Sequence, residues 1–480
     1  MNIDRFLEIE KKYNLYSIDV NGINFWIYFR QKLWNFQICA QKLEMTSATK
    51  IDRSISVFIR RCRYYLNTKI YKNIDILFLN HSRRIKSGRY YDCMYTEEIS
   101  SRYSSTGTLE DAFQQVHFAP NRTANLMFTD NIWINSVAYT KLFKIFSKRK
   151  YNEFYKKIKE QIEPAIKEIE SFYSWEADID KIVLECLNIV LRVTYARGKY
   201  FKVLKKINPK MIVEVVNYSF SRMIVNEYAH MYGIPVVELQ HGIIYSEHAA
   251  YNFASGFDIK QYPDKIFLYS DFWKDQMRPP IPEKNLISVG FPFFEKSIKK
   301  YSNIKRDDNR ITILFISQWT IGEQLSELAV ELSNALPKDG YRIIYKLHPS
   351  EYGDWKEKYK KLDESNVEVI HDNEYSIYKY FAESDIQIGV YSTAIYEGLG
   401  FDLLTLIMMI GHYDTMEPLV NAGYAQYFDS CDDVLDVLKH YDKDKKTNAV
   451  FPLWKTNALN NITEEINKVL ISSEGNADED

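Results

Sequence analysis

Three short polar segments in the C-terminal half of the chain carry side chains that can bind phosphate. They span residues 317–322 (SQWTIG), 346–350 (KLHPS) and 391–394 (YSTA). Each follows an apolar run that we predict to be a buried strand, and open α/β sheets bind ligands beyond the carboxyl ends of their strands. A helix that begins there presents unpaired N–H groups and a partial positive charge, which suit phosphate. The pattern predicts a site for a nucleotide mono- or diphosphate.

The side chains of these segments suggest individual roles. Hydroxyl, ammonium and imidazole groups can bond phosphate oxygens, and a carboxylate one turn into a helix can accept from ribose hydroxyls. The donor-binding candidates are Ser317, Gln318, Thr320, Lys346, His348, Pro349, Ser392, Thr393 and Glu397. Taken singly, a serine or threonine before a helix is most often an N-cap, and a His-Pro pair most often ends a strand. Three such strand ends within one domain favour the functional interpretation.

A histidine in the N-terminal half is the leading candidate for a catalytic base. His241 follows the apolar run 236–239 and precedes Gly242, which permits a tight turn that exposes the imidazole. Imidazole titrates near neutrality and can take a proton from an acceptor hydroxyl. The alternative is a histidine bonded to loop backbone. Glu214 and Asp92 stay open as alternative bases.

The loop after the first predicted strand, residues 80–92, carries two adjacent arginines. Guanidinium groups can hold an acceptor carboxylate or phosphate through paired hydrogen bonds, although a solvated loop explains these arginines about as well. Polar side chains that follow the next two strands would line the same side. The acceptor-binding candidates are Arg83, Arg84, Tyr91, Asn217 and His248.

Alternating strands and helices must position these residues. In the N-terminal half, short apolar runs predict strands at 74–79, 211–216, 236–239 and 265–269 and a helix at 221–232. In the C-terminal half, the pattern predicts strands at 311–316, 341–346, 367–370, 385–390 and 403–408 and helices at 323–336, 376–383 and 394–400. This alternation indicates an α/β protein with two Rossmann-like, doubly wound parallel sheets.

A charge-dense stretch separates the two predicted sheets and is interpreted as a linker. The expected organisation is a helical N-terminal extension (1–70), a Rossmann-like acceptor domain (71–295), the linker (296–310), a Rossmann-like donor-nucleotide domain (311–455), and a C-terminal helix with a disordered acidic tail (456–480). We expect the active site in a cleft between the two domains, which would close over the substrates and exclude water.

Composition disfavours several classes of protein. The 480 residues include 62 basic and 64 acidic side chains, so the basic excess of a nucleic-acid binder is lacking. Five scattered cysteines, without a CxxC spacing, argue against a disulfide framework and a structural zinc site. The sequence contains no Gly-x-Gly-x-x-Gly, Walker A or G-x-S-x-G motif, which disfavours dehydrogenases, kinases and hydrolases.

The expected location is the cytoplasm. The first residues contain no apolar core of a secretory signal, and no apolar run approaches the ~20 residues that cross a bilayer. The basic and aromatic stretch 54–72 (SISVFIRRCRYYLNTKIYK) is compatible with peripheral contact at the inner membrane face, and a surface helix explains it about as well.

Three motif islands carry a resemblance to a known family. QHG at 240–242, KLHPS at 346–350 and YSTAIYEGLGF at 391–401 resemble bacterial capsule and surface-polysaccharide glycosyltransferases. These include Kdo and sialic acid transferases and, more distantly, CDP-glycerol polyol-phosphate transferases. The resemblance covers roughly residues 74–420, but only the islands are specific. It implies the GT-B fold and a reaction without a bound metal or other cofactor, in which the nucleotide-sugar donor is a substrate.

The resemblance also implies roles for single residues. His348 and Pro349 would contact the donor, while Ser392, Thr393 and Glu397 would hold its phosphate and ribose. The family's Gly-Phe-Glu helix start is replaced here by Ile-Tyr-Glu, which keeps the acid and leaves the donor's identity open.

The expected reaction is an inverting transfer of a sugar from a nucleotide-activated donor to a hydroxyl of a growing surface glycan or glycolipid. A CMP-linked sugar is one candidate donor. Three alternatives stay open. They are transfer of a polyol phosphate from a CDP-polyol, isomerisation of the UDP-sugar 2-epimerase type, and a non-catalytic role in glycan assembly.

Overall fold

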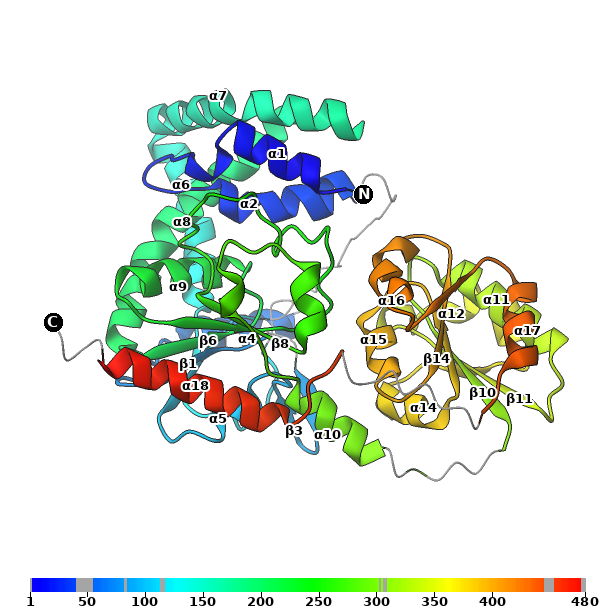
Figure 1. Ribbon diagram of the computed structural model, residues 1–480. Coiled ribbons are helices and arrows are strands. Elements are labelled where there is room, and N and C mark those ends of the chain that lie inside the picture. The colour runs from blue at the N-terminus through cyan, green and yellow to red at the C-terminus, as the bar shows by residue number, and fades with distance from the viewer. Residues whose placement is uncertain are drawn as a thin grey trace. The chain divides into compact units, whose positions relative to one another are not determined.

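The chain folds into two compact units, Met1–Gly290 with Asn457–Asp480, and Phe291–Thr456 (Figure 1). Each unit is built round one parallel sheet. Among the helices of the described residues, none is both long and apolar enough to cross a membrane. The computed structural model describes residues 2–39, 55–81, 84–112, 117–301, 304, 309–443 and 453–475.

Within its described residues, the first unit has a seven-stranded parallel sheet in the order β5-β4-β1-β6-β7-β8-β9. The strands are β1 (Ile76–Leu79), β4 (Thr106–Glu110), β5 (Leu126–Phe128), β6 (Met211–Glu214), β7 (Val236–Leu239), β8 (Lys265–Leu268) and β9 (Leu286–Ser288). The central strands are short apolar runs buried on both faces, as parallel sheets covered by helices require. An antiparallel hairpin of β2 (Ile85–Ser87) and β3 (Tyr90–Asp92) follows β1.

Helices cover both faces of this sheet. Figure 1 shows α9 on one face and α18, in red, along the other, where Ile462, Ile466 and Val469 of α18 join the buried core. The N-terminal helices α1 and α2 pack against α7 and α8 and form a further layer. The helices are α1 (Asp4–Lys12), α2 (Trp26–Lys32), α4 (Ile55–Leu66), α5 (Glu97–Ser100), α6 (Asp130–Phe146), α7 (Lys148–Tyr173), α8 (Ile179–Ile207), α9 (Phe220–Met231) and α18 (Ala458–Gly475).

The described part of the second unit has a six-stranded parallel sheet in the order β12-β11-β10-β13-β14-β15. Its strands are β10 (Ile311–Ile316), β11 (Tyr341–Lys346), β12 (Glu368–Ile370), β13 (Ile386–Gly389), β14 (Leu404–Met408) and β15 (Gln426–Phe428). Its helices are α10 (Pro292–Tyr301), α11 (Gly322–Ala335), α12 (Trp355–Lys358), α13 (Lys360–Asp363), α14 (Ile377–Glu383), α15 (Thr393–Leu399), α16 (Glu417–Asn421) and α17 (Cys431–His440).

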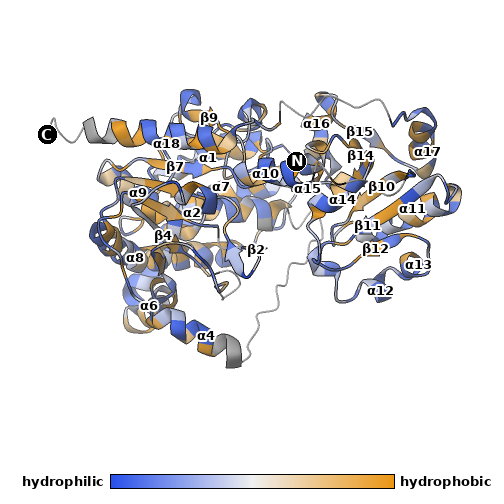
Figure 2. Cartoon of the chain, turned by 90° about the horizontal axis from the view of Figure 1, so that it is seen from below, coloured by the Kyte–Doolittle hydropathy of each residue, from blue (hydrophilic) through white to orange (hydrophobic). Residues whose placement is uncertain are grey.

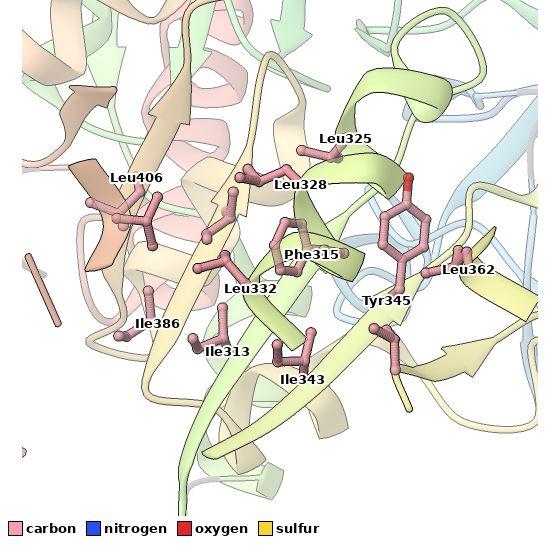
Figure 3. Close-up of a cluster of buried hydrophobic side chains, with 14 of the residues drawn as sticks. Ile313, Phe315, Leu325, Leu328, Leu332, Ile343, Tyr345, Leu362, Ile386 and Leu406 are labelled. Atoms are coloured by element: carbon pink, nitrogen blue, oxygen red, sulfur yellow. The ribbon is translucent and has the colours of Figure 1, made fainter. Parts of the chain in front are cut away.

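One hydrophobic cluster fixes α11 on this second sheet. Figure 3 shows Leu325, Leu328 and Leu332 of α11 above Ile313 and Phe315 of β10. The three leucines recur at helical spacing, and the two strand residues alternate, so that each element presents one apolar face to the other. The packing holds the loop between β10 and α11 at the carboxyl edge of the sheet.

The structure confirms the predicted fold class and the predicted strands, whose ends lie within two residues of their expected positions. In the described residues it adds six short strands that the apolar pattern did not indicate (β2, β3, β4, β5, β9 and β15). Among them is β4, whose sequence Thr-Gly-Thr-Leu-Glu is mostly polar. The stretch 296–310, interpreted as a linker, begins inside α10 of the second unit. The C-terminal helix α18 belongs to the first unit, and residues 476–480 of the acidic tail lie outside the described residues.

Candidate active site

Both sheets reverse their direction of winding at one point. In the first unit the chain runs from β1 outward to β4 and β5, and then returns to β6 on the other side of β1. In the second unit it runs from β10 to β11 and β12, and then returns to β13 on the other side of β10. Open α/β sheets bind ligands outside the carboxyl ends of the strands at such a switch point. Each unit therefore has a defined place for a half-site.

His241 lies at the switch point of the first unit. It follows β7, next to β6, and its ring centroid is 6.0 Å from that of His81, which follows β1. The Nε2 atom of His241 is 3.0 Å from the Tyr218 hydroxyl, and its Nδ1 is 3.5 Å from the Tyr251 hydroxyl. Its backbone carbonyl accepts a hydrogen bond of 2.7 Å from Tyr95. These strand ends bring two histidines and three tyrosines together.

Burial keeps the imidazole of His241 neutral. Its side chain is only 15% exposed. Burial, with smaller contributions from His81 and His248, lowers the pKa of His241 to about 3. Burial likewise lowers the pKa of His248 to about 4. Near neutral pH each ring is therefore uncharged, and it is a weak base unless a nearby negative charge stabilises its protonated form.

A buried carboxyl group lies behind His241. Glu238 on β7 is fully buried, and its Oε1 is 3.9 Å from Nδ1 of His241. It accepts hydrogen bonds from the Asn217 backbone N–H (3.1 Å), the Asn217 side-chain amide and the Tyr251 hydroxyl (2.8 Å). Burial raises the pKa of Glu238 to about 7, so that it ionises in the physiological range. An ionised Glu238 would stabilise the imidazolium that forms when His241 takes a proton.

The backbone beside this cluster is strained. Val216 is β-branched and has a φ of 68°, in the left-handed region, which costs of order 1–3 kcal/mol. The turn that it makes lets Asn217 reach back to Glu238 and places the Tyr218 hydroxyl on His241. Such strain is typical of sites where the position of a side chain matters more than local stability.

The N-terminal helices hold the loop that follows His241. Arg30 of α2 is 1% exposed, lies 2.7 Å from Glu10 of α1 and donates to the backbone carbonyl of Asn252 at 2.9 Å. The ring N–H of Trp34 donates to another carbonyl of the same loop at 2.7 Å. The N-terminal extension thus fixes the chain that carries the neighbours of His241.

The two alternative bases are committed to internal contacts. Glu214 on β6 is fully buried beside its register partner Glu238, and it accepts from the Asn226 amide at 2.9 Å. Burial first, and then the charge of Glu238, raises the pKa of Glu214 to about 8. Asp92 is buried and paired with Arg122, whose Nε lies 3.0 Å away.

In the described residues no three His, Cys, Asp or Glu side chains are arranged to hold a metal ion.

Two of the predicted acceptor-binding residues that follow β1 make contacts within the first unit. Arg84 is buried, and its guanidinium forms an ion pair with Glu110 on β4 in the interior of the unit. Tyr91 on β3 packs its ring 5.3 Å from that of Phe118. Arg83 lies outside the described residues. A role for these three residues in acceptor binding stays a prediction.

Asn217 and His248, also predicted to bind the acceptor, do lie beside His241. Asn217 is 2% exposed and donates to Glu238 from its backbone N–H and from its side-chain amide, which makes it a positioning group. The ring of His248 lies 5.5 Å from that of Tyr218. The structure brings these two predicted residues together with the predicted base.

At the switch point of the second unit, the loop after β10 meets the loop after β13. The hydroxyls of Thr320 and Tyr391 form a hydrogen bond of 2.5 Å between the two loops. In the same loop as Thr320, the side-chain oxygen Oε1 of Gln318 is buried without a hydrogen-bond partner among the described residues. A buried acceptor left unpaired costs about 1–3 kcal/mol. This oxygen can therefore accept a hydrogen bond from a water molecule or from a ligand.

Ser317 and Lys346 turn into the second unit instead. Ser317 is buried and donates to Glu351 at 2.9 Å. The Lys346 ammonium donates to the Tyr352 hydroxyl at 2.6 Å and to the Asp372 carbonyl at 2.8 Å, and burial lowers its pKa to about 8. These contacts hold the loops that follow β10 and β11 in place within the second unit.

His348, Pro349, Ser392 and Thr393 begin helices. His348 caps the short 3₁₀ helix that Pro349 begins, and its Nδ1 accepts from the backbone N–H two residues on at 3.2 Å. Ser392 caps α15 in the same way, also at 3.2 Å, and Thr393 is the first residue of that helix. Ser392 therefore has the capping role that was its alternative interpretation, while His348, for which the alternative was the end of a strand, caps a helix as well. Their contact with a donor stays a prediction.

Glu397 lies one turn into α15. Burial raises its pKa to about 7, against the effect of a hydrogen bond with Tyr378. The next residue, Gly398, faces Gln387 of β13 so closely that an added Cβ would lie 1.9 Å from the amide oxygen. This close contact fixes α15 on the sheet and therefore the position of Glu397.

The sequence analysis did not identify several of the residues that lie around His241. His81, Tyr95, Glu238 and Tyr251 were not selected as candidates. One signal was available, since Glu238 interrupts the apolar run Val-Val-Glu-Leu of β7 and ionisable groups are rarely fully buried. The tyrosines come from loops whose approach depends on the tertiary fold, and no local pattern marks them.

Comparisons with solved structures agree on the fold. No protein-family model and no curated protein sequence matches the chain. The UDP-GlcNAc 2-epimerase of Methanocaldococcus jannaschii aligns over 82% of this chain and 100% of its own, at 11% identity and a TM-score of 0.50. The fold is GT-B.

Two further structures are similar at lower TM-scores. The UDP-GlcNAc 2-epimerase from Neisseria meningitidis, bound to UDP-GlcNAc, covers 82% of this chain and 100% of its own, with 13% identity and a TM-score of 0.43. The wall teichoic acid polymerase TagF, soaked with CDPG, covers 93% of this chain and 98% of its own, with 11% identity and a TM-score of 0.42. At such identities the likeness concerns the fold alone.

Proposed function

We propose that this chain is a glycosyltransferase that moves a sugar from a nucleotide-activated donor to a hydroxyl of a surface glycan or glycolipid. The observation that carries the proposal is the mostly buried imidazole of His241 at the switch point of the first unit, with its Nδ1 3.9 Å from the buried carboxyl group of Glu238. An uncharged base next to an ionisable carboxyl group is what removal of a proton from an alcohol requires.

His241 would act as the base in an inverting, metal-independent displacement. Its Nε2 takes the proton of the acceptor hydroxyl, whose oxygen forms a bond to the anomeric carbon of the donor sugar. The bond between that carbon and the phosphate oxygen breaks, and the nucleotide leaves with the bonding electrons. Glu238, 3.9 Å from Nδ1, stabilises the resulting imidazolium when it is ionised.

The tyrosines round His241 would orient the imidazole and its substrate. Tyr218 lies within hydrogen-bond distance of Nε2, and burial raises its pKa, so its hydroxyl stays protonated. When the acceptor binds, this hydroxyl would turn from Nε2 to the acceptor oxygen and leave the lone pair of Nε2 free for the acceptor proton. The Tyr251 hydroxyl donates to Glu238 and lies near Nδ1, which joins the base to the carboxyl group. These contacts favour one orientation of the His241 ring, so that little conformational entropy is lost when the acceptor binds.

The second unit would hold the nucleotide at its own switch point. Gln318 offers a buried acceptor, and the linked hydroxyls of Thr320 and Tyr391 offer donors at the ends of β10 and β13. Trp319 beside them is exposed and could stack on a base. Ser392, Thr393, His348 and Glu397 complete the proposed donor set.

The test is a mass balance. The purified chain is incubated with CMP-, CDP-, UDP-, GDP- and dTDP-linked donors, each with and without an oligosaccharide acceptor, and the products are weighed by mass spectrometry. The proposal expects an acceptor heavier by one sugar, together with free nucleotide.

Other products would select other reactions. An acceptor heavier by a polyol phosphate identifies a polyol-phosphate transferase. A donor converted without acceptor to an isomer, which has the same mass but separates from the donor by chromatography, identifies an epimerase. If no donor is consumed or bound, the chain is a non-catalytic protein. A His440→Ala variant, which changes an exposed histidine of the second unit, serves as the matched control for later histidine variants.

A further inference from the structure

The corner between α6 and α7 exposes apolar side chains to water. Leu142, Ile145 and Phe146, in the last turns of α6, are 52%, 68% and 78% exposed. They are three and four residues apart, so they share one face of the helix. In a protein that acts as a monomer, an apolar helix face of this kind is normally buried.

The same corner carries a concentrated positive charge. Five basic residues lie within ten positions, at Lys141, Lys144, Lys148, Arg149 and Lys150, and all five are exposed. No acidic residue occurs between Asp130 and Glu153. Within the described residues none of the five forms an ion pair, whereas lysines further along α7 pair with glutamates. The charge of the corner is therefore not neutralised by the chain itself.

The corner is rigid. Ser147 alone separates the two helices, donates its N–H to Phe143 at 2.8 Å, and accepts from the N–H of Tyr151 at 2.9 Å. The rings of Phe143 and Phe154 stack across the corner with centroids 6.0 Å apart. The internal contacts use one side of the corner, and the exposed apolar face points away from them.

A neighbouring helix has the same character. Figure 2 shows α4 beside α6, and Tyr65 of α4 donates to Asn135 of α6 at 3.1 Å. On α4, Ile59 and Leu66 are 61% and 74% exposed, and Arg63 on the same face is exposed as well. Mixed basic and apolar exposure thus occurs on two helices in contact.

We propose that the α6–α7 corner docks the first unit on an anionic lipid surface. Cations on the corner would meet the headgroup phosphates, while Leu142, Ile145 and Phe146 enter the boundary between headgroups and acyl chains. A nucleic acid would use the charges but would leave the aliphatic side chains in water. A membrane surface uses both features, and a reaction at that surface would give access to a lipid-linked acceptor.

Vesicle binding tests the proposal directly. The full chain is mixed with vesicles of zwitterionic lipid alone and of zwitterionic lipid with 30% anionic phosphatidylglycerol, and the bound fraction is measured by flotation. The wild-type chain is expected to bind only the anionic vesicles and to be released by salt. Each basic residue near such a surface contributes roughly fivefold to partitioning, so Lys148→Glu with Arg149→Glu should weaken binding at least tenfold.

Apolar and charged contributions are separated by matched variants. Ile145→Ser with Phe146→Ser should also weaken binding, but without changing its salt dependence. Met231→Ser, at another exposed apolar residue, and Lys205→Glu with Lys206→Glu, at the exposed end of α8, should bind as the wild type does. Circular dichroism confirms that each variant is folded.

Three outcomes would overturn the proposal. They are equal binding to zwitterionic vesicles, equal losses in the control variants, and binding to single-stranded RNA that competes with the vesicles. The proposal is independent of the reaction, because a corner variant should transfer sugar to a soluble acceptor at the wild-type rate. Loss of transfer with retained vesicle binding would count against the proposed function alone.

Discussion

The two adjacent carboxyl groups on β6 and β7 make the stability of the first unit depend on pH in a defined direction. Glu214 and Glu238 are register partners, both fully buried, and burial raises the pKa of Glu214 from 4.5 to about 8. The folded state therefore keeps a proton on Glu214 at pH values where the unfolded chain has lost it. The stabilisation is complete below pH 4.5 and is lost as the pH rises toward 8.

The variant Glu214→Gln isolates this effect. Glutamine has nearly the shape of protonated glutamate and can still accept from Asn226, but it does not ionise. A single group changes the free energy of unfolding by up to about 1.4 kcal/mol per pH unit between its two pKa values. Between pH 6 and pH 8 the wild type should therefore lose about 2 kcal/mol relative to the variant.

Hydrogen exchange measures this change in the first unit alone. Mass spectrometry of peptides that cover β6 and β7 gives the opening free energy of wild type and variant at the same pH, so that the intrinsic exchange rate cancels. Glu153→Gln, at an exposed carboxylate on α7, is the control and should show no pH-dependent difference. If wild type and Glu214→Gln differ equally at pH 6 and pH 8, the carboxyl group is ionised in the folded state and the reasoning fails.

Three other variants test the account. The transfer rate of the wild type should rise with pH through about 7 as Glu238 ionises, and Glu238→Gln should abolish this rise in a pH–rate profile; an unchanged profile would exclude Glu238 from the mechanism. Arg30→Met should destabilise the first unit by about 3–5 kcal/mol in urea, because it leaves Glu10 buried and unpaired, and adding Glu10→Leu should recover most of the loss; a cost below 1 kcal/mol would contradict this. Gly398→Ala should lower the stability of the second unit by about 2 kcal/mol or more, since its Cβ would overlap a buried amide on β13, whereas Gly353→Ala, with open space around it, should be neutral in the same melting experiment.

The alternation of strands and helices was predictable because parallel strands buried on both faces form continuous apolar runs. β7, β10 and β11 begin and end where the apolar pattern predicted. β4 and β5 were missed, since edge positions and polar sequences carry little periodic signal. The second half of α10, from residue 296 onward, was interpreted as part of the linker because it is highly charged and the apolar residues of the helix are mostly at its N-terminal end.

The position of a candidate residue was predictable where that residue comes directly after a strand. His241 and Gln318 follow strand ends, and the structure places both at switch points. The contacts of Lys346 were not predictable from its place at a strand end, because alternation along β11 turns its side chain into the unit, where it bonds a loop carbonyl. Its role in donor binding stays a prediction. The ion pair of Arg84 was not predictable either, since its partner Glu110 lies on a strand that the pattern did not reveal.

His241 carries the central claim, and a pair of measurements on one variant tests it most directly. His241→Ala should lower the rate of sugar transfer by about 10²–10⁴-fold, the usual contribution of a general base, while calorimetry gives an unchanged affinity for the donor nucleotide. His440→Ala should leave both quantities unchanged. A His241→Ala variant that transfers sugar at the wild-type rate would contradict the account.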